Sequence, residues 1–210
     1  MSFRKEIKSI LSNNKTFDLN RWILENGGRL LYPKRIVNSL YFDNWNFSMY
    51  SDSVEGVLPR KKIRLRHYNR KSIQENDFQN INKEMKISSA EGRFKLSSSA
   101  IDSKELILRG FYDKDYGVCY PVTNIIYERV YYKIKNIRLT IDSNISYRQA
   151  SKNGASVFTT KDNFSVVEIK YNNDMNNNFI IRNFPFQFSR FSKYCRAVEF
   201  TNKNYCNEIY

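Results

Sequence analysis

Cysteine and histidine are scarce in this sequence, and neither forms a recognisable metal or redox motif. The three cysteines, Cys119, Cys195 and Cys206, are widely spaced, and none belongs to a Cys-x-x-Cys pair. This odd and scattered set favours neither a disulfide framework nor a zinc site. The single histidine, His67, alternates with the charged residues of its segment and is interpreted as structural. We therefore expect a protein of the reducing cytoplasm.

Long hydrophobic runs are also missing. A membrane span requires about 18 consecutive apolar residues, and the sequence has no such stretch. The first residues include Arg4, Lys5, Glu6 and Lys8 without an apolar run behind them, so a secretory signal is not expected. We expect a soluble protein with no membrane segment. We also expect one domain over residues 1–210, because 41% apolar and 15% aromatic residues can supply a single core.

Helical periodicity is limited to a few short segments. Residues 19–25 place Leu19, Trp22 and Ile23 on one helical face, and Gly27 with Gly28 provides a stop. Residues 103–109 predict a second short helix, and residues 45–52 predict a further turn or two. Most of the remaining sequence alternates polar and apolar residues with a period of two, which is typical of half-buried strands. The predicted fold class is mainly β.

Positive charge dominates what the sequence does contain. Lys and Arg total 35 against 21 Asp and Glu, which gives a formal net charge of +14. Such an excess repels itself unless a polyanionic partner accounts for it. Nucleic acid, an anionic membrane and a phosphate-rich small molecule are the kinds of partner that this charge permits.

The charged residues fall on one face of strand after strand. In residues 62–68, Lys62, Arg64 and Arg66 alternate with Ile63 and Leu65. The same alternation recurs in segments 4–8, 84–87, 93–96, 127–132, 137–142 and 167–170. For any single strand, a solvated sheet face explains this pattern. Its repetition over about seven strands exceeds what edge protection needs. It predicts an antiparallel barrel whose charged interior holds a phosphate chain.

An ordered set of short motifs spans nearly the whole chain. In order, they are Arg4–Lys8, Asn38–Asp43, Lys62–Tyr68, Glu84–Lys86, Tyr127–Arg129, Arg138–Asp142, Glu168–Tyr171 and Ser189–Tyr194. The first four are similar to the first strands, and the last four to the later strands, of the VTC domain. This is the polyphosphate polymerase domain of the triphosphate tunnel metalloenzyme (CYTH-like) superfamily. The resemblance implies a tunnel-shaped antiparallel β-barrel, the triphosphate tunnel fold, with a few flanking helices.

The resemblance also implies an activity, a cofactor and a set of site residues. Members of the family transfer the γ-phosphate of ATP to a growing polyphosphate chain with Mn²⁺ or Mg²⁺, so the partners would be ATP, triphosphate and polyphosphate. The implied catalytic residues are Arg64, Arg66, Lys86, Arg129, Arg138 and Glu168. The implied substrate-binding residues are Lys8, Arg93, Lys95, Tyr127, Arg190 and Lys193. Glu168 would be the main metal ligand, and Glu6 a second acidic residue of the tunnel.

The acidic residues have a structural alternative. Glu6, Glu84 and Glu168 could neutralise Lys or Arg across strands instead of binding a metal, an alternative that is weaker for Glu168. Asp43 and Asp142 are expected to end strands and start turns. Among the acidic residues, Glu168 therefore ranks first as a metal ligand.

Other residues and other functions also stay open. Tyr127 could only pack its ring, and Arg190 and Lys193 could be ordinary surface cations. A triphosphatase would hydrolyse inorganic or nucleoside triphosphate in the same lumen, and a non-catalytic module would bind polyphosphate or nucleotide without turnover. A nucleic-acid binder is disfavoured, because glutamates among the cations would repel the backbone. Eukaryotic relatives carry an SPX domain and membrane helices; neither is present in this sequence, so export of a product would need a membrane partner.

Overall fold

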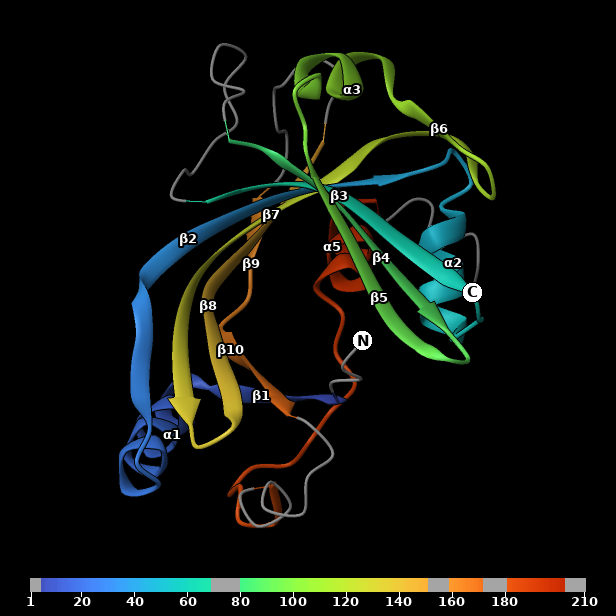
Figure 1. Ribbon diagram of the computed structural model, residues 1–210. Helices are drawn as coiled ribbons and strands as arrows, with labels where there is room; N and C mark the ends of the chain where they lie inside the picture. The colour runs from blue at the N-terminus through green and yellow to red at the C-terminus, as the bar shows by residue number, and fades with distance from the viewer. Residues whose placement is uncertain (1–4, 69–79, 151–158, 172–180, 203–210) are drawn as a thin grey trace. The chain divides into compact units, whose positions relative to one another are not determined.

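The computed structural model describes residues 5–68, 80–150, 159–171 and 181–202 (Figure 1). Arg4 and Cys206 lie outside these ranges. The strands are β1 (Lys5–Ser12), β2 (Arg29–Asp43), β3 (Arg60–Tyr68), β4 (Asn82–Ser89), β5 (Gly92–Ser99), β6 (Phe111–Asp113), β7 (Gly117–Ile134), β8 (Ile137–Gln149), β9 (Thr159–Lys161) and β10 (Phe164–Tyr171). The helices are α1 (Asn13–Glu25), α2 (Ser48–Glu55), α3 (Ser103–Arg109) and α5 (Lys193–Thr201).

The strands follow the order β1-β10-β8-β7-β2-β3-β4-β5, with β6 beside β7 and β9 beside β8. The chain divides into two compact units. Unit 1 contains Met1–Ile36, Tyr127–Ile145 and Lys161–Phe191, and unit 2 contains Val37–Ile126, Ser146–Thr160 and Ser192–Tyr210. The long strands β2, β7 and β8 contribute a segment to each unit. The expectation of a single domain stays a prediction.

In unit 1, the apolar face of the sheet packs against α1, which lies beside β1 in Figure 1. The buried side chains of this core include Leu11, Leu19, Trp22, Ile23, Ile134, Ile137, Leu139, Ile141, Val167, Ile169 and Phe184. The Trp22 and Phe184 rings meet edge to face at 5.3 Å, and the indole Nε1 donates to the Asn183 carbonyl at 3.0 Å. The three apolar residues predicted for the helical face are therefore the ones that α1 buries.

The end of α1 is also where the sequence predicted it. Gly27 adopts a φ of +71°, which favours glycine, and the Gly28 amide donates to the Ile23 carbonyl at 2.7 Å. A Cβ on Gly28 would lie 2.3 Å from the Ile23 side chain, so glycine allows this close return of the chain. The helix starts at Asn13, earlier than predicted. Its first turns were not predicted because they are mostly polar and carry no apolar periodicity.

The strand registers of unit 1 place the charged residues on the face opposite to α1. Across β1, β10 and β8, Glu6 pairs with Lys170, and Lys170 pairs with Arg138. In the next row of the same face, Lys8 pairs with Glu168, which pairs with Thr140. The intervening residues of these strands are apolar and face the core. The predicted separation of a charged and an apolar face is confirmed for these strands.

In unit 2, β3 lies between β2 and β4, and all three are antiparallel to their neighbours. Arg64 has Tyr41 on one side and Glu84 on the other, and Arg66 has Ser39 and Asn82. The alternate residues of β3, such as Ile63, Leu65 and His67, are buried on the other face. The interpretation of His67 as a structural residue agrees with this burial.

Of the three helices described in unit 2, two were predicted from the sequence and one was not. The predicted helix at residues 103–109 is confirmed as α3, and the turn predicted for residues 45–52 forms as α2 at Ser48–Glu55. Helix α5 was missed, because residues 189–194 were interpreted as part of a strand-like motif. Its apolar stripe of Tyr194, Ala197, Val198 and Thr201 has helical spacing and is buried. Lys193 therefore begins a helix and does not lie on a strand.

The two aspartates expected at strand ends differ in their positions. Asp43 ends β2, as predicted. Asp142 lies inside β8 and not at its end, so this prediction was wrong. Cys119 and Cys195 are buried free thiols. In the described residues, none of the helices combines the length and the apolar character that crossing a bilayer requires.

The core of unit 1 predicts a large effect of shortening a side chain that faces α1. Leu139 is fully buried in this core. Leu139→Ala should lower the free energy of unfolding by about 2 to 5 kcal/mol, because it removes apolar contacts and leaves a cavity. Leu24→Ala is the matched control, since Leu24 is 70% exposed on α1 and should change stability by no more than about 0.5 kcal/mol. Urea unfolding measures both, and equal effects would contradict the assigned core.

Candidate functional site

Charged side chains gather on the polar face of each unit. In unit 2, we define the Glu84 cluster as Tyr41, Lys62, Arg64, Arg66, Glu84, Lys86, Arg93 and Lys95, which share one face of β2 to β5. In unit 1, we define the Glu168 cluster as Glu6, Lys8, Arg129, Arg138, Asp142, Glu168 and Lys170, from β1, β7, β8 and β10.

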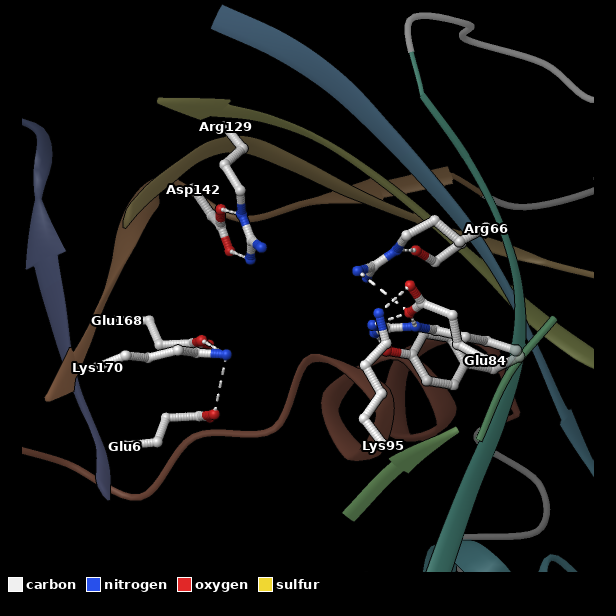
Figure 2. A network of polar contacts seen from close by, with 11 residues as sticks. Glu6, Arg66, Glu84, Lys95, Arg129, Asp142, Glu168 and Lys170 are labelled. Atoms are coloured by element: carbon white, nitrogen blue, oxygen red, sulfur yellow. Dashed lines mark hydrogen bonds and ion pairs between the residues drawn. The ribbon is translucent and has the colours of Figure 1, made fainter. Parts of the chain in front are cut away.

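Glu84 is the centre of an ion-pair network in unit 2, as Figure 2 shows. Arg64 donates to its Oε2 atom from Nε at 2.8 Å and from Nη2 at 2.5 Å. Arg66 Nη1 lies 3.4 Å from the same oxygen, and Lys95 Nζ lies 2.6 Å from Oε1. Glu84 is only 2% exposed. Its carboxylate on β4 therefore organises three cations of the two flanking strands, β3 and β5.

The charges around Glu84 keep it ionised. Burial raises the pKa of this carboxyl group, but Arg64, Arg66 and the hydrogen bond from Lys95 outweigh burial and lower the pKa to about 2. Glu84 could bind a metal or neutralise neighbouring cations. In this structure, it neutralises cations of the adjacent strands. The Glu84 cluster contains six cations and one carboxylate, and three of the cations pair with that carboxylate.

Three lysines form a row across β3, β4 and β5. Lys62 is directly opposite Lys86, and Lys86 is directly opposite Lys95. Like charges in directly opposed positions destabilise a sheet unless another group compensates them. Lys62 Nζ donates to Ser192 Oγ at 2.8 Å, and Lys95 binds Glu84. A row of this kind is suited to an anion with several charged oxygens.

Tyr41 of the Glu84 cluster and the neighbouring Ser39 both lie on β2, and neither was predicted as a site residue. Arg64 Nη1 donates to Tyr41 Oη at 2.6 Å, and Arg66 Nε donates to Ser39 Oγ at 3.0 Å. Burial raises the pKa of the Tyr41 hydroxyl, but Arg64 and Arg66 outweigh it and bring the pKa below its usual range. The alternation of residues 38–43 could have pointed to both side chains, but their partners follow only from the register.

The Glu168 cluster of unit 1 contains more balanced charges. Lys170 Nζ lies 2.8 Å from Glu168 Oε1 and 3.4 Å from Glu6 Oε2, a row that Figure 2 displays. Lys8 Nζ lies 3.3 Å from the other oxygen of Glu6 and donates to the Phe191 carbonyl at 2.9 Å. The two acidic residues predicted as metal ligands therefore share one ammonium group.

Arg129 has a two-point ion pair with Asp142. Its Nε and Nη2 atoms lie 2.5 Å and 2.7 Å from the two carboxylate oxygens. The guanidinium also lies over the Tyr127 ring at 5.2 Å and the Tyr131 ring at 5.8 Å. Burial lowers the pKa of Arg129, but Asp142, Tyr127 and Glu168 raise it well above its usual range. Asp142, expected to start a turn, instead orients this arginine.

The remaining predicted site residues are distributed as follows. Arg138 lies beside Lys170 on the charged face of unit 1, and Tyr127 is buried under the Arg129 guanidinium. Arg93 lies on the exposed end of β5, on the same face as Lys95. Arg190 precedes α5, and Lys193 is its first residue. A channel lined by all of these side chains would involve both units, and it stays a prediction.

The chemistry of Glu6 and Glu168 decides whether they suit a divalent metal. Glu6 and Glu168 both reach Lys170 Nζ, so this part of the face accommodates a positive charge between two carboxylates. Over the described ranges, no group of three or more His, Cys, Asp or Glu side chains could hold a metal. Mg²⁺ is usually bound by one or two carboxylates together with substrate phosphates and water. The pair therefore fits a metal that is shared with a phosphate ligand.

The comparison with solved structures shows the class of fold. The Hippeastrum protein HpAC1, named as an adenylyl cyclase and described as having a dominant triphosphatase activity, aligns with a TM-score of 0.54 at 13% identity, over 93% of this chain and 95% of that chain. A conserved protein of Pyrococcus furiosus aligns with a TM-score of 0.50 at 11% identity, over 91% of this chain and 99% of that chain. The predicted class, a mainly β antiparallel triphosphate tunnel fold, is confirmed.

The family follows from the sequence match. The model of the VTC domain matches residues 3–115 and 111–202. The chain therefore belongs to the VTC domain family, as the ordered motifs predicted. No curated protein matches the chain in sequence.

The ion pairs of Glu84 predict a pH-dependent contribution to stability. Its pKa is about 2 in the folded protein against 4.5 in the unfolded chain. The ionised form therefore stabilises the fold above pH 4.5, and this contribution is lost as the pH falls toward 2. The shift corresponds to about 3 kcal/mol. Glu84→Gln should be less stable than the natural protein at pH 7, and the difference should shrink below pH 4.5. Urea unfolding at several pH values measures it, and a constant difference would contradict the assigned ion pairs.

Proposed function

We propose that this chain transfers the γ-phosphate of ATP to a growing polyphosphate chain. The observation that carries the proposal is the Glu84 cluster, in which six cations share a strand face with one ionised carboxylate. Membership of the VTC domain family supports a phosphate substrate for this face. In the reaction, the bond between the γ-phosphorus and the bridging oxygen of ADP breaks. A terminal phosphate oxygen of the chain forms the new P–O bond, and ADP leaves.

The residue types suit phosphoryl transfer. Its transition state spreads negative charge over several oxygens, so positioning and positive charge contribute more than a covalent nucleophile. Arg64, Arg66 and Arg129 are each oriented by neighbouring side chains, and a guanidinium can bind two phosphate oxygens at once. We assign catalytic roles to Arg64, Arg66, Lys86, Arg129, Arg138 and Glu168. We assign substrate binding to Lys8, Arg93, Lys95, Tyr127, Arg190 and Lys193.

Glu168 and Glu6 would hold the divalent metal, Mn²⁺ or Mg²⁺. When bound, such a metal neutralises charge on the phosphate oxygens and helps to orient them. Lys170 now neutralises both carboxylates, so it would give up part of these ion pairs to the metal. The flexible stem and compact charge of a lysine suit such an exchange.

A triphosphatase is the second candidate function. It is favoured by the likeness in fold to HpAC1, which is described by a dominant triphosphatase activity. The same cations would then bind inorganic or nucleoside triphosphate, and water would take the place of the phosphate chain as acceptor. The two activities differ in their product, which makes them separable in one assay.

Incubation of the purified protein with ATP and Mn²⁺ tests both activities. Long-chain polyphosphate together with ADP is expected, and gel electrophoresis with phosphate analysis would detect them. Free phosphate without a polymer would instead support the triphosphatase. If ATP stays intact with each of several divalent metals while polyphosphate binds tightly, both enzymatic proposals are wrong and the chain is a binding module.

Glu168→Gln should abolish metal-dependent turnover, because an amide is a poor ligand for a hard divalent cation. Its fold should persist, as the circular dichroism spectrum would show. Glu128→Gln is the matched control: Glu128 lies on β7 of the same unit and pairs with Lys34 at 3.0 Å. Full activity of Glu168→Gln would refute the metal assignment.

Arg64→Ala or Arg129→Ala should each weaken tripolyphosphate binding by about 1.5 to 3 kcal/mol, because each removes a charge-assisted hydrogen-bond donor. Isothermal titration calorimetry measures the change. Arg109→Ala serves as the control, since the Arg109 side chain is 79% exposed on α3. An equal loss in the control would mean that general charge, and not these two positions, governs binding.

A further inference from the structure

Two stacked tyrosines connect Arg64 to helix α5 within unit 2. Tyr41 Oη accepts a hydrogen bond from Arg64 Nη1 at 2.6 Å. The Tyr41 ring stacks on the Tyr194 ring, with centroids 5.0 Å apart and an interplanar angle of 20°. Both rings are buried, at 7% and 1% exposure. A tyrosine of α5 therefore limits the movement of the hydroxyl group that binds Arg64.

Asp43 fixes the second of these tyrosines. The Tyr194 hydroxyl donates to Asp43 Oδ2. The Asp43 carboxylate also accepts the backbone amides of Met49 and Tyr50 at 3.0 Å each, and that of Asn44 at 2.8 Å. Burial raises the pKa of Tyr194, and the charge of Asp43 raises it further, so the hydroxyl stays protonated and donates. One fully buried carboxylate thus joins the end of β2, the start of α2 and α5.

A second contact holds the start of α5 against the Glu84 cluster. Ser192 Oγ accepts the Cys195 amide at 3.3 Å, which caps the helix, and it also accepts Lys62 Nζ at 2.8 Å. The Lys62 ammonium lies 5.7 Å from the centre of the Tyr194 ring. The first turn of α5 therefore contacts the two adjacent cations of β3, one directly and one through Tyr41.

We propose that Tyr41, Tyr194 and Asp43 are positioning residues, which set the orientation of the Arg64 guanidinium for a triphosphate ligand. The inference rests on the proposed function. Glu84 holds the Nε and Nη2 side of Arg64, and Tyr41 holds Nη1. A guanidinium held from both sides cannot rotate about the Glu84 contact, so it binds phosphate without an additional loss of rotational freedom.

A purely structural role is the alternative, because a buried aromatic pair also stabilises a core. The two roles differ in their coupling to Arg64. If Tyr41 acts through Arg64, loss of its hydroxyl affects triphosphate affinity only while the guanidinium is present. If Tyr41 only packs, its effect on affinity does not depend on residue 64. Tyr→Phe variants suit the comparison, since they keep the rings stacked.

The experiment measures tripolyphosphate affinity by isothermal titration calorimetry in a double-mutant cycle. Tyr41→Phe is expected to weaken binding by about tenfold, and Tyr194→Phe by about threefold, since it acts one contact further away. In the Arg64→Ala background, neither change should weaken binding further. Tyr147→Phe is the matched control: Tyr147 is another fully buried tyrosine of unit 2, with its ring packed at 5.8 Å from Phe200. This control should leave the affinity unchanged.

The outcomes separate the inference from the function on which it rests. If the natural protein does not bind tripolyphosphate, the proposed function is wrong and the inference fails with it. If it binds, but Tyr41→Phe has no effect or has an equal effect in the Arg64→Ala background, the inference alone is wrong. Thermal unfolding of each variant shows whether the fold is retained. Asp43→Asn provides a further variant, and it should reproduce the affinity loss of Tyr194→Phe.

Discussion

The alternation of side chains between the two faces of a strand is the constraint on which the rest of this structure depends. Because the strands pair in a fixed register, the side chains on one face of a strand line up with those on the same face of the next strand. Lys62, Lys86 and Lys95 therefore share a face, and Ile63 and Met85 share the opposite one. A slip of one residue would move a whole row of charges into the apolar core. Burial of the apolar face thus determines where the charges lie.

The two clusters use carboxylates in different proportions. In the Glu84 cluster, one carboxylate is shared by three cations, and the lysine row adds like charges in opposed positions. In the Glu168 cluster, three carboxylates accompany four cations, and each has a cation within ion-pair distance. The first arrangement places more cations than carboxylates on one strand face, a composition typical of anion sites. In the second, Lys170 lies within ion-pair distance of two carboxylates, and the proposed metal site rests on this pair. The difference in balance is the reason why we propose the metal at Glu6 and Glu168 and not at Glu84.

Local pattern was enough to predict the strands, the charged face and the helix at residues 103–109, because each depends on near neighbours in sequence. Contacts between strands could not be predicted in the same way. Asp142 was expected to start a turn, yet it orients an arginine of the adjacent strand. The bond between Tyr41 and Arg64 depends on the pairing of β2 with β3, which neither segment encodes alone. Helix α5 was missed although Tyr194 begins a helical stripe, because the preceding motif resembled a strand.

Residues 192–194 belong to the segment that was interpreted as a strand, and their contacts explain why serine, lysine and tyrosine follow one another there. Ser192 binds Lys62 and caps α5, while Tyr194 binds Asp43 and stacks on Tyr41. Lys193 lies between these two anchored residues, so its backbone is held from both sides. A long cationic side chain on a fixed backbone loses less freedom on binding an anion than one on a mobile loop does. The order of serine, lysine and tyrosine thus places the proposed substrate-binding Lys193 between two structural anchors, which neither composition nor strand periodicity would reveal.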